Sequence, residues 1–433
     1  MKASVFLGLR ALRGRGGTGR YLRGTVAGIA LGLVPLLVVM EVSTGMIDGI
    51  TARLLEVASS HLQATLPGTL GDDDLTAAAR VVEGLPGVRA ATAERQGTVL
   101  LALGQRSTGV TLRCVDPAGF ASDAGLHRYL ATTEGSLDLA RPRTVLVSAA
   151  LARTLGVRAG DTVLAVAGLA GDASVLPRVN RLVVGGVYET GYQELDKTVA
   201  YAALGDAGAV LPPRGARTLL GVKVDEPFAD LDAVASRVAE ALGPDARVSA
   251  WRDLERSRLA SFETTRWLLV LIMALVAAVA AANVSATVLM LVLERRQEIG
   301  ILLGIGARPA VLARSFLLAG LAAAAAGTAL GVALGLLVAV NINGVIAILD
   351  RLLNLGAGAL SLARSLVLPG AVAPDARLTL FQSAYYLQSI PVRIRAVEVV
   401  AAACGTLLVA SLAAWLPARG AGRLSPLEVL RRA

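Results

Sequence analysis

Four long stretches of this sequence contain no charged residue, and they limit the possible fold more than any other feature. Asp, Glu, Lys and Arg are absent from residues 24–40, 267–293, 315–349 and 399–418. To cross a bilayer, a helix needs roughly 20 apolar residues, each advancing it by about 1.5 Å. The last three stretches are long enough by themselves, and the first is long enough if its helix continues to Gly45. The sequence therefore predicts four transmembrane helices.

The first stretch admits two interpretations. If its helix continues to Gly45, Glu41 lies near the membrane surface or inside a helix bundle, where an ionisable side chain is tolerated. A cleaved signal peptide is the alternative, because it also has a basic start and an apolar core. The apolar core here exceeds the about 7 to 15 residues typical of signal peptides, and no A-x-A-like cleavage site follows it. We therefore interpret the stretch as a retained membrane anchor.

The distribution of charge predicts the orientation of these helices. Residues 1–24 contain six basic residues and no acidic one, and residues 294–314 contain four basic and two acidic residues. Residues 45–266, by contrast, contain 23 basic and 26 acidic residues. Because cytoplasmic segments of membrane proteins are enriched in Lys and Arg, both chain ends and the 294–314 connection are predicted to be cytoplasmic. The net charge of +9 is then a topology signal, and no nucleic-acid partner is predicted.

The predicted fold class is an α-helical membrane protein with four transmembrane helices and a large α+β extracytoplasmic domain between helices one and two. Residues 51–266 are too many for a simple connector, and residues 145–166 show a strand–helix–turn–strand pattern. The domain could comprise two lobes divided near residues 139–144. The predicted segments are a cytoplasmic amphipathic helix (1–23), the first span (24–45), the extracytoplasmic domain (46–252), a stalk with the second span (253–293), a cytoplasmic connection (294–310), the third span (311–340), an outer loop (341–395), the fourth span (396–416) and a cytoplasmic tail (417–433).

A proline pair interrupts the extracytoplasmic domain. In the stretch AVLPPRGARTL, residues 209–219, two consecutive prolines lack the amide hydrogens that a central strand requires. This stretch is predicted to be a stiff, exposed loop. Its role stays open between an ordinary turn and a loop on which a partner docks.

The sequence contains no recognisable catalytic or metal-binding motif. Its only histidines, His61 and His127, are far apart and belong to no H-E-x-x-H motif. No lysine occurs in the Gly-Lys-[Ser/Thr] context with which ATPases hold phosphate. We therefore predict that the chain is not an enzyme and binds no metal or cofactor, and that any ATP driving it is hydrolysed by another chain.

A dense cluster of charge lies between the second and third apolar stretches. In ERRQEIGILLGIGARP, residues 294–309, Ile299, Leu302 and Leu303 are at helical spacing, and the glycines and proline that follow limit how far a helix can continue. A small amphipathic helix held between two membrane helices is suited to insert into a groove of a soluble partner. On composition alone, a capped turn with a solvated charge cluster is the alternative.

Two stretches of the sequence, the charged connection and the C-terminal end, resemble motifs of a known protein family. ERRQEIGILLGIGA, residues 294–307, resembles the E-[RK]-x-x-E-I-[GA]-[IV]-L-x-x-x-G-A motif of FtsX-like ABC transporter permeases, and PARGAGRLSPLEVLRR, residues 417–432, resembles their C-terminal motif. Shorter stretches, among them VYETGYQELDKTVAY and YYLQSIPV, are similar to the lipoprotein-releasing, or Lol-type, membrane subunits of that family. The resemblance extends over nearly the whole chain and agrees with the predicted topology.

The resemblance implies a set of partners and a location. Permeases of this family pair as identical or homologous subunits and bind a dimer of cytoplasmic ABC ATPases, which holds ATP and Mg²⁺. Lol-type members extract lipoproteins from the bacterial inner membrane and pass them to a periplasmic carrier protein. The chain is accordingly expected to be a multi-pass subunit in that membrane, with both termini in the cytoplasm.

The resemblance also implies roles for particular residues. Those that match the ATPase-coupling segment are Glu294, Arg295, Glu298, Ile299, Leu302 and Gly306, to which the apolar face adds Leu303. Those that match the loop on which the carrier docks, called the hook, are Leu211, Pro212 and Pro213. The chain departs from the Lol-type pattern in the basic RGAR sequence after the prolines and in the stretch 352–380, which is longer than in those relatives.

A site for lipid chains must be apolar and must open sideways near the outer leaflet. Val38, Val42 and Met46 are spaced i, i+4 and i+8 at the outer end of the first helix, and the flexible Met273 is on the second. These four residues are the predicted substrate cavity, although ordinary helix packing would account for each of them.

The predicted function is that of a permease subunit that releases lipoproteins. One alternative is export of a drug or peptide by the same architecture, as in macrolide exporters. Another is transmission of ATPase motion to a cell-wall hydrolase without transport. The proline loop distinguishes release from signalling, because a docked lipoprotein carrier favours release and a docked hydrolase favours signalling.

Overall fold

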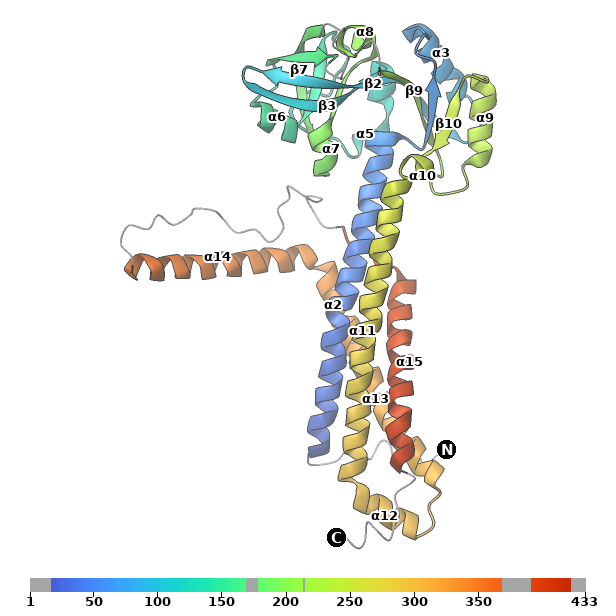
Figure 1. The fold of residues 1–433 in the computed structure, drawn as a ribbon, viewed down its shortest axis with the longest axis vertical. Coiled ribbons are helices and arrows are strands. Elements are labelled where there is room, and N and C mark those ends of the chain that lie inside the picture. The colour runs from blue at the N-terminus through green and yellow to red at the C-terminus, as the bar shows by residue number, and fades with distance from the viewer. Residues whose placement is uncertain (1–16, 169–177, 213–214, 368–390, 422–433) are drawn as a thin grey trace. The chain divides into compact units, whose positions relative to one another are not determined.

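The computed structural model describes residues 17–168, 178–212, 215–367 and 391–421. These residues form two compact units. The helical unit contains the described residues up to Met46 and those from Ser261 onward, and the mixed unit extends from Ile47 to Ala260. Figure 1 shows the long helices of the first unit and the sheet of the second.

Each of the four predicted spans corresponds to a long apolar helix. Four helices are long and apolar enough to cross a membrane, and they cover Arg23–Ser59, Arg256–Glu294, Pro309–Val340 and Ala396–Gly420. The long helices are α2 (Gly17–Arg53), α11 (Arg256–Glu294), α13 (Pro309–Val340) and α15 (Ala396–Ala421). Between them lie α12 (Arg296–Gly304), which connects α11 to α13, and α14 (Ile342–Val367), which follows α13.

Glycines allow α13 to approach its neighbours closely. A Cβ atom added to Gly331 would lie 3.0 Å from Leu33 Cβ and 3.1 Å from Ala30 Cα of α2. A Cβ atom added to Gly320 would lie 2.6 Å from Val288 Cγ2 of α11. Helix backbones come this close only where the facing residues are small. These two glycines therefore permit the packing of α13 against α2 and α11.

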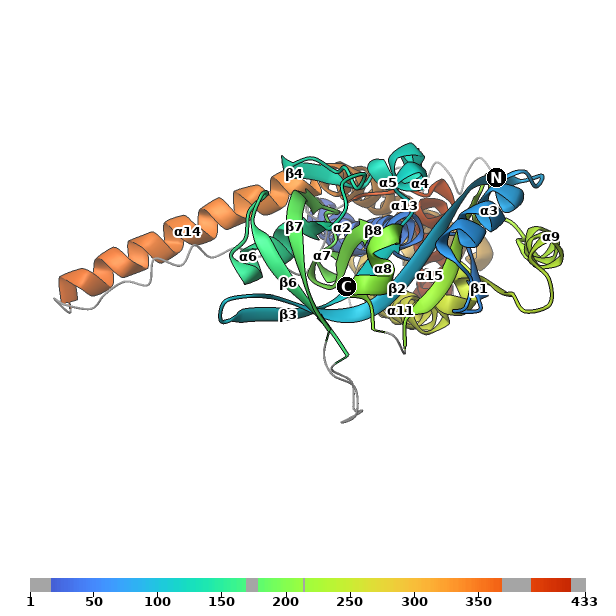
Figure 2. The same ribbon diagram turned by 90° about the horizontal axis from the view of Figure 1, so that it is seen from above.

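The segment predicted as an outer loop, residues 341–395, begins with a helix of 26 residues, α14. Figures 1 and 2 show α14 running away from the other helices of its unit. The rest of that segment up to residue 390, the predicted N-terminal helix up to residue 16 and the tail from residue 422 lie outside the described residues. Residues 17–23 belong to α2.

The mixed unit is built on one ten-stranded sheet. Its strands are β1 (Leu62–Leu66), β2 (Val88–Leu103), β3 (Arg106–Val115), β4 (Ala131–Gly135), β5 (Thr144–Ser148), β6 (Thr162–Ala167), β7 (Arg178–Glu189), β8 (Val199–Ala203), β9 (Arg217–Val224) and β10 (Arg247–Ala250). Their order is β10-β1-β9-β2-β3-β8-β5-β7-β4, and β6 pairs with β2 and β7. Because β8 lies between β3 and β5, strands from before and after residues 139–144 share this sheet, and the sheet is not divided there.

Short helices cover the sheet and connect its strands. They are α3 (Asp72–Glu83), α4 (Pro117–Ser122), α5 (Ala124–His127), α6 (Ala149–Leu155), α7 (Gln193–Thr198), α8 (Ala207–Val210), α9 (Asp232–Leu242) and α10 (Trp251–Leu254), with a π-helical turn, η1 (Leu54–Ser59), and a 3₁₀ turn, η2 (Leu204–Asp206). The predicted strand–helix–turn–strand pattern is confirmed as β5, α6 and β6. The Ser148 side chain caps the start of α6, and Gly156, at φ 74°, ends it.

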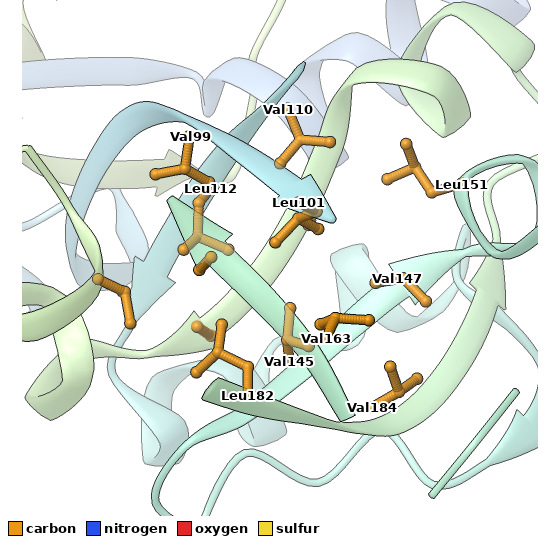
Figure 3. Packing of buried hydrophobic residues seen from close by; sticks show 14 of the residues in the cluster. Val99, Leu101, Val110, Leu112, Val145, Val147, Leu151, Val163, Leu182 and Val184 are labelled. Atoms are coloured by element: carbon orange, nitrogen blue, oxygen red, sulfur yellow. The ribbon is translucent and has the colours of Figure 1, made fainter. Parts of the chain in front are cut away.

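β2 links two hydrophobic cores of the mixed unit. One core, shown in Figure 3, packs residues of β2, β3, β5, β6 and β7 against α6, with Leu101, Leu112 and Leu182 at 0% exposure. The other packs β1 and β9 against α3 and α9, with Leu75 and Val238 fully buried. Residues 88–96 of β2 pair with β9, and residues 94–103 pair with β3. Figures 1 and 2 show α3 and α9 at the end of the sheet that contains β1 and β10.

Candidate functional site

The connection between α11 and α13 is a short helix whose end is fixed by backbone geometry. α12 is followed by Gly306 at φ 92°, a left-handed conformation that glycine adopts without strain. The amides of Gly306 and Ala307 donate to the carbonyls of Leu303 and Leu302 at 3.0 and 2.9 Å, which is the hydrogen-bond pattern of a Schellman cap. Pro309 then starts α13, where a missing amide hydrogen costs nothing. The path of this connection is therefore well defined.

One face of α12 packs against α13. Ile299 is only 1% exposed and lies in a buried cluster with Leu312 and Phe316 of α13. Leu302 and Leu303 are partly buried against the same cluster. These three residues, which were predicted to couple the chain to an ATPase, thus hold α12 in place. Because burying an aliphatic side chain stabilises a structure by about 1.5–3 kcal/mol, Ile299 is the main anchor of the connection.

The opposite face of α12 presents aliphatic and charged side chains to the surface. Ile301 of α12 and Ile305, the residue after its last turn, are 56% and 77% exposed. Glu298 is exposed beside them and forms an ion pair with Arg295 at 3.2 Å, and Glu294 is exposed at the end of α11. Sequence reasoning missed Ile301 and Ile305, although their four-residue spacing places them on one side of a helix. An exposed aliphatic pair bordered by charges is suited to bind a groove on a soluble partner.

The predicted hook begins beside the sheet of the mixed unit. Leu211 is buried in the core of Figure 3, at 3% exposure, and Pro212 is half-buried with its ring near Gly97 of β2. Asn180 Nδ2 of β7 donates to the carbonyl of Ala209 at 2.6 Å, which fixes the start of the loop. Pro213 lies outside the described residues. The prediction that residues 209–219 are an exposed loop is thus wrong at Leu211, which is buried at the end of α8, and a docking surface would have to be formed by the residues that follow it.

The residues of the predicted substrate cavity lie on two helices of the helical unit. Val38, Val42 and Met46 of α2 are half-buried. Met273 of α11 is packed against a small cluster that contains Leu37 of α2 and Ala402 of α15. Met273 therefore has a packing role, and the lipid contact of all four residues stays a prediction.

A cluster of polar side chains joins α2, α11 and α15. Glu398 of α15 accepts hydrogen bonds from Arg266 Nη2 of α11 at 2.7 Å and from Thr44 Oγ1 of α2 at 3.1 Å. Glu41 of α2 is fully buried, and its Oε2 accepts from the backbone amide of Arg395 at 3.2 Å. Of the two positions considered for Glu41, the one inside the helix bundle is confirmed.

The histidines of the chain have structural roles. Nδ1 of His61, a buried residue, accepts a hydrogen bond from the amide of Val224 at 2.9 Å. His127 Nε2 lies 3.0 Å from the carbonyl oxygen of Phe120. Among the residues that the structure describes, no group of three or more His, Cys, Asp or Glu side chains is arranged to hold a metal ion. Both imidazoles thus have backbone partners within the mixed unit.

Two protein families match this chain in complementary regions. The family described as FtsX-like permease C-terminal matches residues 270–426, which include α12 and the last two spans. The family described as MacB-like periplasmic core domain matches residues 24–241, about half of the chain. The second match therefore covers most of the mixed unit, and the first covers the connection described above.

Two solved structures are also similar to parts of the chain. The periplasmic region of MacB from Actinobacillus actinomycetemcomitans has 12% identity and a TM-score of 0.32, and the match covers 47% of this chain and 94% of that one. The extracellular domain of the noncanonic ABC-type transporter YknZ from Gram-positive bacteria has 15% identity and a TM-score of 0.30, and that match covers 43% of this chain and 98% of the other.

Curated relatives match the chain along its whole length. The lipoprotein-releasing system transmembrane protein LolC of Neisseria meningitidis serogroup B is 28% identical over 440 residues, with 99% of this chain and 98% of the relative covered. A LolC protein of Xylella fastidiosa is 27% identical over 438 residues, with the same shares covered. Taken with the two family matches, this similarity shows that the chain belongs to the FtsX-like permeases with a MacB-like periplasmic core domain, and that it is a permease subunit of an ABC transporter.

Proposed function

We propose that this permease subunit extracts lipoproteins from the bacterial inner membrane and passes them to a periplasmic carrier protein. The observation that carries the proposal is the match to lipoprotein-releasing relatives over 99% of this chain and 98% of theirs. A match of this extent includes the membrane spans, the periplasmic core and the connection that contains α12. The substrate class is thus taken from proteins with the same arrangement of parts.

Energy reaches the chain through α12 in this proposal. A separate dimer of ABC ATPases binds ATP and Mg²⁺ in the cytoplasm, and the chain itself hydrolyses nothing and holds no cofactor. The exposed Ile301 and Ile305 enter a groove of the ATPase, while the buried Ile299 joins α12 to α13. Because α12 is packed against α13 and capped at Gly306, a displacement of the ATPase moves α13 instead of bending the connection.

The outer part of the cycle uses the predicted cavity and hook. Acyl chains of the lipoprotein enter beside Val38, Val42 and Met46 of α2, with Met273 of α11 nearby. The carrier docks on the loop that starts at Leu211 and continues through the two prolines. A second permease, identical or homologous, completes the transporter, and both termini of this chain lie in the cytoplasm.

Purification of the assembled transporter followed by a release assay tests this proposal. The chain is isolated from its native membrane under mild conditions, and the proteins that co-purify are identified. The complex is then placed in vesicles with a fluorescent triacylated lipoprotein, and transfer to a soluble carrier is measured after ATP is added. We expect an ATPase and a lipoprotein carrier to be found, and ATP-dependent transfer to occur.

A Val42→Asp substitution tests the cavity separately. A carboxylate at this half-buried position disfavours acyl chains, so lipoprotein should no longer stimulate ATP hydrolysis by the complex. Basal hydrolysis without lipoprotein serves as the control and should not change. Normal stimulation in this variant would remove Val42 from the substrate path.

Export of another amphipathic molecule, or mechanical signalling, is the second candidate function. It is favoured by the match of residues 24–241 to the MacB-like periplasmic core domain, a family that is not named for lipoprotein release. The same purification distinguishes the candidates. A cell-wall hydrolase or an exporter component in place of the carrier, together with no lipoprotein transfer, would support the second candidate.

A further inference from the structure

α14 begins where a membrane span ends. Asn341 alone separates Val340, the last residue of α13, from Ile342, the first of α14. The Asn341 amide donates to the carbonyl of Leu337 at 3.3 Å, and the amide of Val345 donates to the carbonyl of Asn341 at 2.9 Å. These bonds connect the last turn of α13 to the first turn of α14. Because α13 is a membrane span, the first turn of α14 lies where the chain leaves the hydrocarbon.

One side of α14 exposes large aliphatic side chains. Those between 41% and 70% exposed are Ile348, Leu349, Leu352, Leu353 and Leu355. At about 100° per residue, these five positions occupy an arc of roughly 160° around the helix. A continuous apolar surface of this kind is unfavourable in water and marks contact with a partner or a membrane.

The other side of α14 is polar or small. Asn343, Ala347, Asp350 and Asn354 fall within an arc of roughly 60°, opposite the aliphatic residues. Asp350 and Asn354 are half-buried, and Asn354 Nδ2 donates to the carbonyl of Asp350 at 2.7 Å. Two faces of opposite character are typical of a helix that lies in the plane of a membrane surface.

The aliphatic side of α14 follows a row of exposed aliphatic side chains on α13. Leu330, Leu334, Leu337 and Val340 are exposed on α13 and are spaced three or four residues apart, which places them on one side of the helix. In a membrane span, such a row faces acyl chains, and this row ends at the residue before Asn341. An exposed aliphatic row of α13 is therefore followed along the chain by the exposed aliphatic side chains of α14.

We propose that α14 lies in the membrane–water interface, with its aliphatic side among the acyl chains and its polar side toward water. The proposed function places both termini in the cytoplasm, and the assignment of sides rests on it. The membrane surface is then that of the outer leaflet. With 26 residues, the helix is about 39 Å long. A helix of this length keeps the outer end of α13 at a constant depth while α12 is displaced.

A fifth membrane span is a less favourable arrangement of the same residues. A span of roughly 20 residues starting at Ile342 would place Asp350 and Arg351 near the centre of the bilayer. It would also place Asn343 and Asn354 in hydrocarbon, on the face that is already polar. A helix surrounded by lipid is apolar around its circumference, whereas α14 is apolar on one side.

Site-directed fluorescence on the full-length chain tests the proposal. Cys404, which is exposed, is replaced by Ala, and Cys114 is buried. A single cysteine then replaces either Leu352, on the aliphatic side, or Ala347, on the polar side, and carries an environment-sensitive fluorophore. The protein is reconstituted in vesicles of phosphatidylethanolamine and phosphatidylglycerol. Quenching is measured with aqueous iodide and with lipids that carry a nitroxide either near the headgroup or at the end of the acyl chain.

The two labels should respond in opposite ways. We expect the Leu352→Cys label to be quenched by the nitroxide near the headgroup and to be roughly threefold less sensitive to iodide than the Ala347→Cys label. Adding Ile348→Asp and Leu355→Asp should detach the helix and raise iodide quenching at Leu352→Cys to the level of the other label. If that variant does not fold, the comparison of the two single labels remains decisive.

Four results would overturn the proposal. Equal iodide quenching of both labels would place α14 in water, and stronger quenching by the nitroxide at the acyl-chain end would make it a span. Self-quenching that unlabelled protein relieves would show that a second copy covers the aliphatic side. If the lipids of the inner leaflet are the ones that protect the Leu352→Cys label from iodide, α14 lies on the opposite membrane surface and the assignment of sides is reversed. Because the labels report on the helix whatever is transported, normal quenching without lipoprotein release would count against the proposed function alone.

Discussion

The buried Lys223 of β9 forms an ion pair with the half-buried Glu56 of the π-helical turn, with 2.7 Å between Nζ and Oε2. The same Nζ lies 2.6 Å from Oδ2 of Asp123, and the lysine side chain is only 6% exposed. Arg89 approaches Glu56 from the surface at 3.3 Å. One ammonium group thus neutralises two carboxylates that come from distant parts of the chain, and it attaches η1 to the sheet of the mixed unit.

Replacing Lys223 by Met should destabilise the mixed unit. The substitution leaves the half-buried carboxylates of Glu56 and Asp123 without their shared cation. Removing one partner of a fully buried pair costs about 3–5 kcal/mol, and the cost here should be smaller because Arg89 still lies 3.3 Å from Glu56. We expect a clearly lower unfolding midpoint for the purified chain in detergent. Lys223→Arg retains the charge and is the matched control. A Met variant as stable as the wild type would show that the pair contributes nothing to folding.

Substitution of Ile301 and Ile305 by Ala should weaken binding of the ATPase. The changes remove exposed aliphatic side chains from α12 and from the residue that follows it, and a loss of about tenfold in affinity per residue corresponds to about 1.4 kcal/mol. The fold should be unaffected, because neither residue is buried. Ile299→Ala is the contrasting variant, since it should lower stability as well. The measurement is the amount of ATPase that co-purifies, and undiminished recovery with the double variant would exclude this face as the contact.

Gly331→Leu should disturb the packing of α13 against α2. Even the first atom of the new side chain would lie 3.0 Å from Leu33 Cβ and 3.1 Å from Ala30 Cα, and overpacking of this kind costs about 1–3 kcal/mol. Gly405→Ala in α15 is the control, because a Cβ atom there meets nothing within 4 Å and Ala favours a helix. Thermal unfolding in detergent should separate the two variants, with only the first destabilised. Equal midpoints would mean that α2 shifts to accommodate the leucine.

The pH dependence of stability should include a contribution from Asp196. Burial raises the pKa of this carboxyl, against the opposing effect of two hydrogen bonds that the amide and hydroxyl of Thr190 donate to Oδ1 at 2.9 and 2.8 Å. An acid whose pKa is raised by folding stabilises the fold at pH values below its unfolded pKa, and this contribution is lost as the pH rises through the folded value.

Asp196→Asn tests this sign directly. The amide oxygen of Asn can accept the same two hydrogen bonds but carries no charge, so the variant should be more stable than the wild type at about pH 7 and similar to it at about pH 4. Unfolding midpoints at the two pH values provide the measurement. A variant that is equally destabilised at both would show that the ionised carboxylate is needed for the fold.

The membrane helices were predictable because charge is excluded from hydrocarbon, whatever the tertiary structure. The third span was predicted to end at residue 340, as α13 does, but the absence of charge did not reveal that a second helix follows it directly. Residues 315–349 form one apolar stretch, yet they contain the end of α13, the break at Asn341 and the start of α14. Residues 341–395 were predicted as a loop, so the prediction placed the break correctly and missed α14.

The candidate site shows a similar limit. Both faces of α12 carry aliphatic residues, and periodicity alone cannot tell which face is covered. Contact with Leu312 and Phe316 selects Ile299 for burial and leaves Ile301 and Ile305 exposed. The ion pair between Lys223 and Glu56 joins residues 167 positions apart, and no local pattern identifies such partners. The position of β8 between β3 and β5 is equally non-local.

The length of β2 has a consequence for how the mixed unit responds to force. β2 is a single strand of 16 residues that pairs with β9 near its start and with β3 near its end. If the part of the sheet in one core unfolds, the sheet in the other core is therefore incomplete. Pulling on either side should therefore produce one rupture event and a single cooperative melting transition. A domain of this kind transmits load as a rigid block up to the point at which it fails.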